Sequence, residues 1–112
     1  MKLFKFLIVM LILTLLFFYS CAGNKYSSEF DFANKLAKKE LWKEAQMRWQ
    51  KILDSGKESA SLYNNIAIAF EKMGKPKEAE KAYKKALALS PNNSKIKSNY
   101  EGLKKNLKKS EE

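Results

Sequence analysis

Hydrophobic residues follow two different patterns along the chain. Residues 6–19 form an apolar run that carries no charge and only two hydroxyl groups, those of Thr14 and Tyr19. From about residue 28 onward, apolar residues instead recur at the i, i+3, i+4 spacing of an amphipathic helix, among many Lys, Glu and Ala. No stretch alternates apolar and polar residues as a half-buried β-strand does. The pattern predicts an all-α fold behind an apolar N-terminal segment.

Glycine and proline divide the amphipathic part into helices. Gly56 and Gly74 each follow a periodic stretch, Pro76 opens the next stretch, and Pro91 follows its end. Glycine just past a helix and proline in its first turn are the usual arrangement. The first residues of the third and fifth predicted helices are also suitable N-caps. The predicted helices lie near Ser28–Lys39, Trp42–Asp54, Ser59–Met73, Pro76–Leu89 and Asn93–Lys109.

The apolar N-terminal run is typical of an export signal. It is shorter than the about 20 residues that a membrane-crossing helix needs, and it follows a positive region with Lys2 and Lys5. The letters FYSC at its end, which close on Cys21, resemble a bacterial lipoprotein signal. In that family a small residue precedes a cysteine that is lipidated and becomes the first residue after cleavage. The resemblance implies a signal peptide over residues 1–20, acyl chains such as palmitate on Cys21, and a tether over residues 21–28.

An uncleaved membrane anchor is the alternative for this segment. The helix would then run from Leu3 to Tyr19, and Cys21 would be a bystander near the interface. Both interpretations place the rest of the chain outside the cytoplasm, because Lys2 and Lys5 favour an N-terminus that stays inside. The expected location is a bacterial cell membrane or outer membrane, with the chain held there by its lipid anchor.

The amphipathic part contains an internal repeat. Its clearest unit is ASLYNNIAIAFEKMGKPKEAEKAYKKALALSP, which begins at Ala60 and resembles a tetratricopeptide repeat, a 34-residue helix–turn–helix unit. The residues that carry the resemblance are Tyr63, Ile66, Ala67, Phe70, Gly74, Ala79, Tyr83, Ala86 and Pro91. A step back of 34 positions meets a similar set at Phe32, Ala33, Leu36, Ala45, Trp49 and Ile52.

The repeat implies a short α-solenoid. We expect repeats over residues 26–59 and 60–93, and a capping helix over residues 94–109, within a domain that spans residues 29–112. The last helix carries one apolar stripe on a lysine-rich surface, as a terminal cap does. Alanines on the predicted packing faces let antiparallel helices approach closely, and the aromatic residues fill the space between hairpins. Since about three repeats are normally needed for stability, a partner or a second copy of the chain could complete the stack.

Composition removes several classes of function. The chain has one cysteine, no histidine and one arginine, with a formal charge of +10. A disulfide framework and histidine-based catalysis are therefore excluded, and a charge carried almost wholly by lysine argues against specific nucleic-acid binding. There is no glycine-rich phosphate loop and no acidic cluster with metal spacing. We expect no enzyme activity, no cofactor and no metal.

Binding is the function that remains. In tetratricopeptide proteins the first helix of each hairpin lines a concave groove for peptides, and Trp42 and Trp49 are expected mainly as core residues. By this resemblance the groove positions are Ser27, Phe30, Asp31, Asn34, Lys38, Ser61, Asn64, Asn65, Ile68, Lys72, Lys95, Ser98 and Asn99.

Two interpretations of the groove asparagines stay open. In the chaperone-tail binders of this family, lysines, arginines and asparagines grip a C-terminal carboxylate, and Asn34, Asn65 and Lys95 stand at three of those five positions. Phe30 and Asn99 occupy the other two, where basic residues are expected. The other interpretation is structural, because an asparagine amide can bond to backbone carbonyls of the neighbouring helix.

These observations predict an adapter or assembly factor that holds a protein or peptide partner in the cell envelope. A self-assembling scaffold on an uncleaved anchor is the alternative, and a binder of nucleic acid or another polyanion conflicts with export. The C-terminal lysines are either a solvated face or an adhesive for anionic surfaces next to the anchor. They are Lys95, Lys97, Lys104, Lys105, Lys108 and Lys109.

Overall fold

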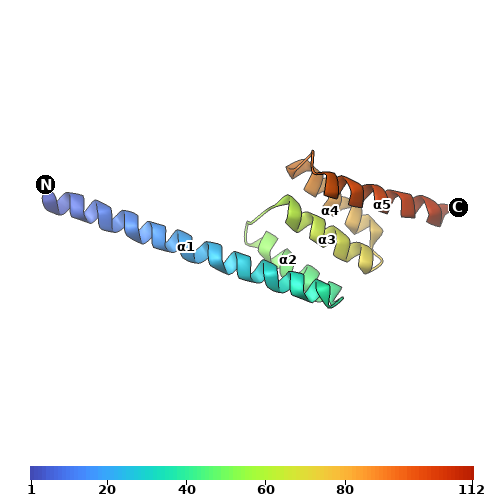
Figure 1. Ribbon diagram of the computed structural model, residues 1–112, viewed down its shortest axis with the longest axis horizontal. Coiled ribbons are helices and arrows are strands. Elements are labelled where there is room, and N and C mark those ends of the chain that lie inside the picture. The colour runs from blue at the N-terminus through green and yellow to red at the C-terminus, as the bar shows by residue number, and fades with distance from the viewer.

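The structure is a computed structural model that describes residues 1–112, except for the side chains of residues 20–24. Its elements are the helices α1 (Lys2–Lys38), α2 (Trp42–Asp54), α3 (Ala60–Lys72), α4 (Pro76–Leu89) and α5 (Ser94–Glu111). Every element of the described chain is a helix, which confirms the predicted all-α class. Figure 1 shows α1 as a long rod, with the other helices gathered around its C-terminal part.

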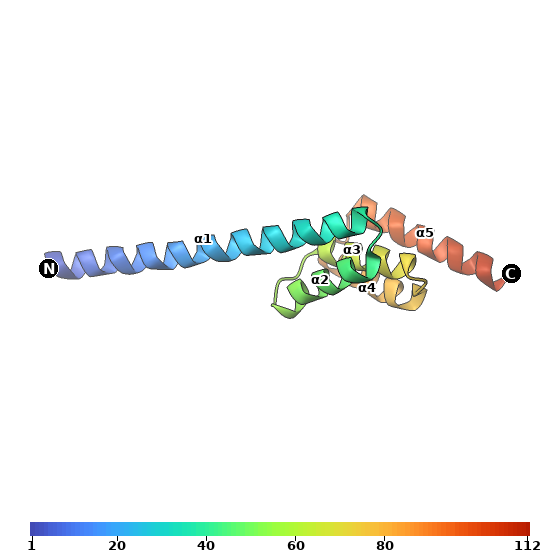
Figure 2. The ribbon, with the colours of Figure 1, turned by 90° about the horizontal axis from the view of Figure 1, so that it is seen from below.

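The body is a short stack of helix hairpins. The C-terminal part of α1 pairs with α2, α3 pairs with α4, and α5 closes the stack against α4 and α3. Helices α1, α3 and α5 run in the same direction, and α2 and α4 run back (Figures 1 and 2). This arrangement confirms the predicted α-solenoid of two hairpins and a capping helix behind an apolar helix.

The helix starts follow the capping residues in the sequence. The Ser59 hydroxyl oxygen accepts a hydrogen bond from the Leu62 backbone N–H (3.1 Å) at the start of α3. At the start of α5, the Asn93 side-chain oxygen accepts one from the Ile96 N–H (3.1 Å). Both bonds satisfy amides that have no partner within the helix. The two predicted N-caps are therefore confirmed.

The turns that follow α1, α2 and α3 share one backbone conformation. After α3, the Lys75 N–H bonds back to the Phe70 carbonyl (2.8 Å), and Gly74 between them has φ 70°. Gly56 adopts φ 85° at the equivalent place after α2. After α1 that place is taken by Glu40, which adopts φ 61° without being glycine. A side chain in this left-handed region is strained, so the first hairpin carries a strain that the second avoids.

The core lies between the hairpins and mixes small with aromatic residues. Trp49 and Tyr83 are its most deeply buried aromatic residues, 2 % and 0 % exposed, and Tyr63 is 8 % exposed. Around them lie the buried alanines Ala33, Ala45, Ala67, Ala69, Ala79, Ala82 and Ala86. Burial of Tyr83, and then the hydrogen bond that its hydroxyl donates to the Glu71 carboxylate, raise the pKa of this tyrosine above its usual value of 10.0. The alanines that the sequence assigned to close helix packing are thus buried.

The capping helix is attached through Tyr100. Its ring lies 5.9 Å from that of Tyr83, and its hydroxyl donates a hydrogen bond to the Glu80 carboxylate on α4 (3.0 Å). Lys84 lies 2.9 Å from the same carboxylate. The Lys84 bond and then the Tyr100 bond lower the pKa of Glu80. Helix α5 therefore docks through both an apolar stripe and a polar contact.

The start of the first helix differs from the prediction. A helix was expected near Ser28 after a tether, but α1 begins at Lys2 and includes residues 25–28. Those four residues contain no proline or glycine that would break a helix. Tyr26 stacks on Phe30, with ring centroids 6.2 Å apart, and both pack against the core. The tether is therefore part of α1 where the structure describes it.

The N-terminal part of α1 exposes its apolar side chains. Over Lys2–Tyr19 the mean hydropathy is 2.2 and no residue is buried by the rest of the chain. By length and composition this segment is able to cross a membrane, and a signal sequence has the same properties. The predicted lipidation site, Cys21, lies outside the described residues.

The strain at Glu40 generates the first prediction. Glu40→Gly should raise the free energy of unfolding by about 0.5–1 kcal/mol, because glycine adopts a positive φ without a steric cost. Gly74→Ala should lower it by about 1 kcal/mol, although a Cβ there meets nothing within 4 Å. The measurement is thermal unfolding of the full chain in mild detergent, followed by near-ultraviolet circular dichroism. Glu40→Ala is the control, since it removes the charge and keeps the strain. A loss of stability in Glu40→Gly would contradict the argument.

Candidate functional site

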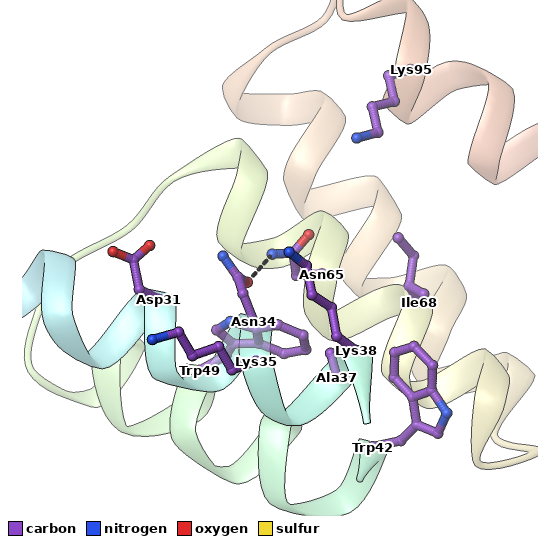
Figure 3. Close-up of a pocket in the computed structure, with 10 residues that line it drawn as sticks. All are labelled: Asp31, Asn34, Lys35, Ala37, Lys38, Trp42, Trp49, Asn65, Ile68 and Lys95. Carbon is purple, nitrogen blue, oxygen red and sulfur yellow. Dashed lines mark hydrogen bonds between the residues drawn. The ribbon is translucent and has the colours of Figure 1, made fainter. Parts of the chain in front are cut away.

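A groove of about 570 Å³ opens on the face formed by the first helices of the hairpins. Figure 3 shows the residues that line it, with those of α1 and α3 facing one another and Lys95 set apart on α5. They are Asp31, Asn34, Lys35, Ala37, Lys38, Trp42, Trp49, Asn65, Ile68 and Lys95. The groove therefore draws on four helices, and its walls are held by the hairpin core beneath.

Helical spacing places the α1 residues on this face. Asp31, Asn34, Lys35 and Lys38 are separated by three or four positions, so their side chains project from one side of the helix. Three lysines, Lys35, Lys38 and Lys95, stand against the single carboxylate of Asp31 in the lining. The groove is positive and favours a ligand that carries negative charge or hydrogen-bond acceptors.

Two asparagine pairs join the first helices. Asn65 donates a side-chain hydrogen bond to the Asn34 side-chain oxygen (3.2 Å) across α1 and α3. Asn99 donates one to the Asn64 oxygen (3.0 Å) across α3 and α5. The structural interpretation expected bonds to backbone carbonyls, whereas these bonds join side chain to side chain. Each pair fixes the spacing of two helices that border the groove.

The first pair keeps hydrogen-bonding capacity for a ligand. Neither the side-chain N–H₂ of Asn34 nor the side-chain oxygen of Asn65 takes part in a side-chain hydrogen bond within the described chain. Both residues line the groove together with Lys95. A donor, an acceptor and a cation thus border one cavity.

The two tryptophans have different places. Trp49 is a core residue, as predicted, and its indole N–H finds no hydrogen-bond partner among the described residues. Trp42 packs partly against the core and also forms a wall of the groove, with the Lys72 ammonium 5.9 Å from its ring centroid. Trp42 therefore offers a partly open aromatic surface that the core interpretation did not assign to it.

The predicted groove residues fall into three groups. Those that line the groove are Asp31, Asn34, Lys38, Asn65, Ile68 and Lys95. Ile68 also borders a shallower cavity of about 330 Å³ beside α5, together with Lys72, Ser98 and Asn99. Four predicted residues line neither cavity, namely Ser27, Phe30, Ser61 and Asn64. Phe30 packs against the core, and Asn64 is only 5 % exposed.

Lys35 and Ala37 were not among the groove residues predicted from the sequence. Lys35 lies four positions after Asp31, so its helical phase was the signal that could have identified it. Nothing in the local pattern marks Ala37, whose place in the wall depends on how α1 packs on α2. Among the described residues, no group of three or more His, Cys, Asp or Glu side chains could hold a metal ion.

Comparison with protein families identifies one repeat. Residues 60–93, which hold α3, α4 and the turn that follows, match the tetratricopeptide repeat family. This is the unit predicted for that range. A comparison with curated proteins found no match. The first hairpin stands one repeat earlier in the stack. The two donors Asn65 and Asn99 are 34 positions apart, and each donates to an asparagine on the preceding first helix.

The asparagine pair beside α5 generates the second prediction. Asn99→Ala should lower the free energy of unfolding by about 1–3 kcal/mol, because it leaves the buried oxygen of Asn64 without a donor. The double variant Asn64→Ala with Asn99→Ala should lose less than the sum of the single variants, since no polar group is then left unpaired. Thermal unfolding of the full chain checks both. Asn106→Ala, at an exposed position of α5, is the matched control, and an equal loss of stability in that variant would contradict the structural role of Asn99.

Proposed function

We propose that the protein is a membrane-anchored adapter that holds a peptide segment of a protein partner in the groove, on the outer side of a bacterial membrane. The observation that carries this proposal is the groove itself, which combines the aromatic wall of Trp42 on α2, the Asn34–Asn65 amide pair, and three lysines on α1 and α5. The tetratricopeptide repeat at residues 60–93 supports a role in protein–protein interaction.

The lining suits an extended polypeptide with acidic groups. The amide groups of Asn34 and Asn65 offer one donor and one acceptor, which matches the alternating groups of a peptide backbone. Lys38 and Lys95 provide cations for an acidic side chain or a C-terminal carboxylate. Trp42 provides an apolar surface at the end of the same groove. The chemistry therefore favours an acidic peptide over a neutral small molecule.

The anchor would raise the local concentration of the groove at the membrane. Two chemistries fit the N-terminal segment, namely acyl chains on Cys21 after cleavage and a retained helix over the apolar residues. In both cases the partner meets the groove at the surface instead of in free solution, so a weak groove contact becomes effective. This role requires no turnover and no cofactor.

Site-specific photo-crosslinking tests the groove. A photoreactive amino acid at Lys38 should give a discrete crosslinked product in native membranes, and Asn65→Ala with Trp42→Ala should reduce it at least severalfold. The same group at Lys77, which is exposed on α4 outside the groove, is the matched control. Equal products from both positions would contradict the groove proposal.

The same crosslinking experiment distinguishes self-assembly of the chain from binding of a different protein. Phe32 and Met47 on the outer face of the first hairpin are 45 % and 52 % exposed, and they border a cavity of about 270 Å³ with Leu36. This apolar face is where a further hairpin or a second copy would stack. A crosslinker at Met47 that gives a product of twice the chain mass would favour the scaffold.

The intact mass of the protein from its native membrane tests the anchor. A chain that begins at Cys21 and carries acyl mass is the expected result for the lipoprotein, and Cys21→Ser should abolish both the added mass and the cleavage. A chain that begins at Met1 with an unmodified thiol would contradict lipidation and leave the retained helix as the anchor.

A further inference from the structure

A second cavity lies where α1 enters the body. It has a volume of about 430 Å³ and is bordered by α1, the end of α2 and the turn that follows α2. Its charged lining residues are Lys25 and Glu29 on α1, Arg48 and Lys51 on α2, and Lys57 in the turn. We call it the basic pocket, since four cations face one carboxylate.

Not all of these charges are equally available. The Arg48 guanidinium lies 3.6 Å from the Glu29 carboxylate and 5.0 Å from the Phe32 ring centroid, so its charge is largely matched. Lys25, Lys51 and Lys57 take part in none of the ion pairs formed within the described chain. All three are exposed. The pocket therefore keeps three lysines whose ammonium groups can reach an anion.

Tyr26 orients one of these lysines. The Lys57 ammonium lies 5.7 Å from the Tyr26 ring centroid, an arrangement in which the ring attracts the cation. This contact also ties the turn after α2 to the first residues of the body on α1. The pocket is thus assembled from three segments that are separated in the sequence.

The basic pocket lies on the side of the body that faces the apolar segment. Lys25 follows Tyr19, the last residue of that segment, by six positions, which is about 9 Å along a helix. A lipid headgroup layer extends about 5–8 Å beyond the hydrocarbon core on each side. The long side chain of Lys25 therefore reaches the level of lipid phosphates. Cleavage before Cys21 would bring Lys25 nearer to the hydrocarbon core, because Lys25 would then follow the acylated residue by four positions, about 6 Å along a helix.

The lysines at the end of α5 lie elsewhere. Helices α1 and α5 run in the same direction, so α5 begins on the side of the apolar segment and ends at the opposite extreme of the molecule (Figure 1). Lys104 is also paired with Glu101 at 2.6 Å. This placement disagrees with adhesion of Lys104, Lys105, Lys108 and Lys109 next to the anchor, whereas the basic pocket lies on the side of the body that faces the anchor.

We infer that the basic pocket binds the phosphate groups of anionic phospholipids in the membrane that anchors the chain. Three uncommitted lysines supply the charge, and Tyr26 adds an aromatic ring of the kind that gathers at membrane interfaces. The contact would hold the body against the bilayer and set the direction in which the groove opens. This inference rests on the proposed membrane attachment.

Hydrogen exchange of the full chain in lipid nanodiscs tests the inference. In nanodiscs that contain phosphatidylglycerol, backbone amides of residues 51–57 should exchange severalfold more slowly than in nanodiscs of phosphatidylcholine alone. High salt should remove the difference, because exposed charges are screened. The triple variant Lys25→Gln, Lys51→Gln, Lys57→Gln should lose it as well, while core amides keep their protection and report an intact fold.

Two controls separate the possible outcomes. The variant Lys104→Gln, Lys105→Gln, Lys108→Gln loses the same charge at the far end of α5, and it should keep the slow exchange. Inorganic phosphate added to phosphatidylcholine nanodiscs tests a free anion, and protection there without protection by the anionic lipid would overturn the inference. Equal exchange in both lipids, with the chain incorporated, would overturn it too. Failure of the chain to enter nanodiscs would instead overturn the membrane attachment.

Discussion

Close packing of alanine against aromatic residues is the constraint on which the structure depends. Buried alanines such as Ala45 and Ala79 let α2 and α4 approach their partner helices, and Trp49 and Tyr83 fill the space that the curved stack leaves between hairpins. Replacement of an alanine by a larger residue would separate the helices of one hairpin and displace its neighbour. Each hairpin buries its face only against the next, so the chain needs both hairpins and α5 to complete one core.

That packing also creates the groove. Because the hairpins stack on one another, α1, α3 and α5 run in the same direction along one face of the stack. Asn65 and Asn99, which are one repeat of 34 positions apart, each bond to an asparagine on the preceding first helix, Asn34 and Asn64 respectively. The lining then depends on residues that the core leaves at the surface, among them Lys38 and Trp42. A groove of this kind needs no loop insertion and no metal to hold its shape.

The continuity of α1 links the groove and the basic pocket to the apolar N-terminal segment. The helix is 37 residues long, and its first residues in the body already pack against the core through Tyr26 and Phe30. A stiff connection transmits orientation, whereas a flexible tether would let the body turn freely. The basic pocket lies at this junction, and the groove lies on the same stack of first helices. Attachment of the pocket to lipid and presentation of the groove to a partner are therefore geometrically compatible.

Local sequence patterns determined the helices, their caps and the repeat. The caps Ser59 and Asn93 act within one helical turn, and the spacing of Ala79 and Tyr83 sets one buried face of α4. Interactions between residues close in the sequence were therefore sufficient to predict these features. The tertiary structure alone decided which side chains share a cavity. Phe30 was expected in the groove but packs in the core, and Lys35 lies in the lining. The basic pocket brings Lys25 on α1 near Lys51 on α2 and Lys57 in the turn that follows α2. Their proximity depends on how these three segments pack together. The periodicity of one helix determines which residues share its apolar or polar face. Only the packing of that helix against its neighbours determines which residues of different helices border the same cavity.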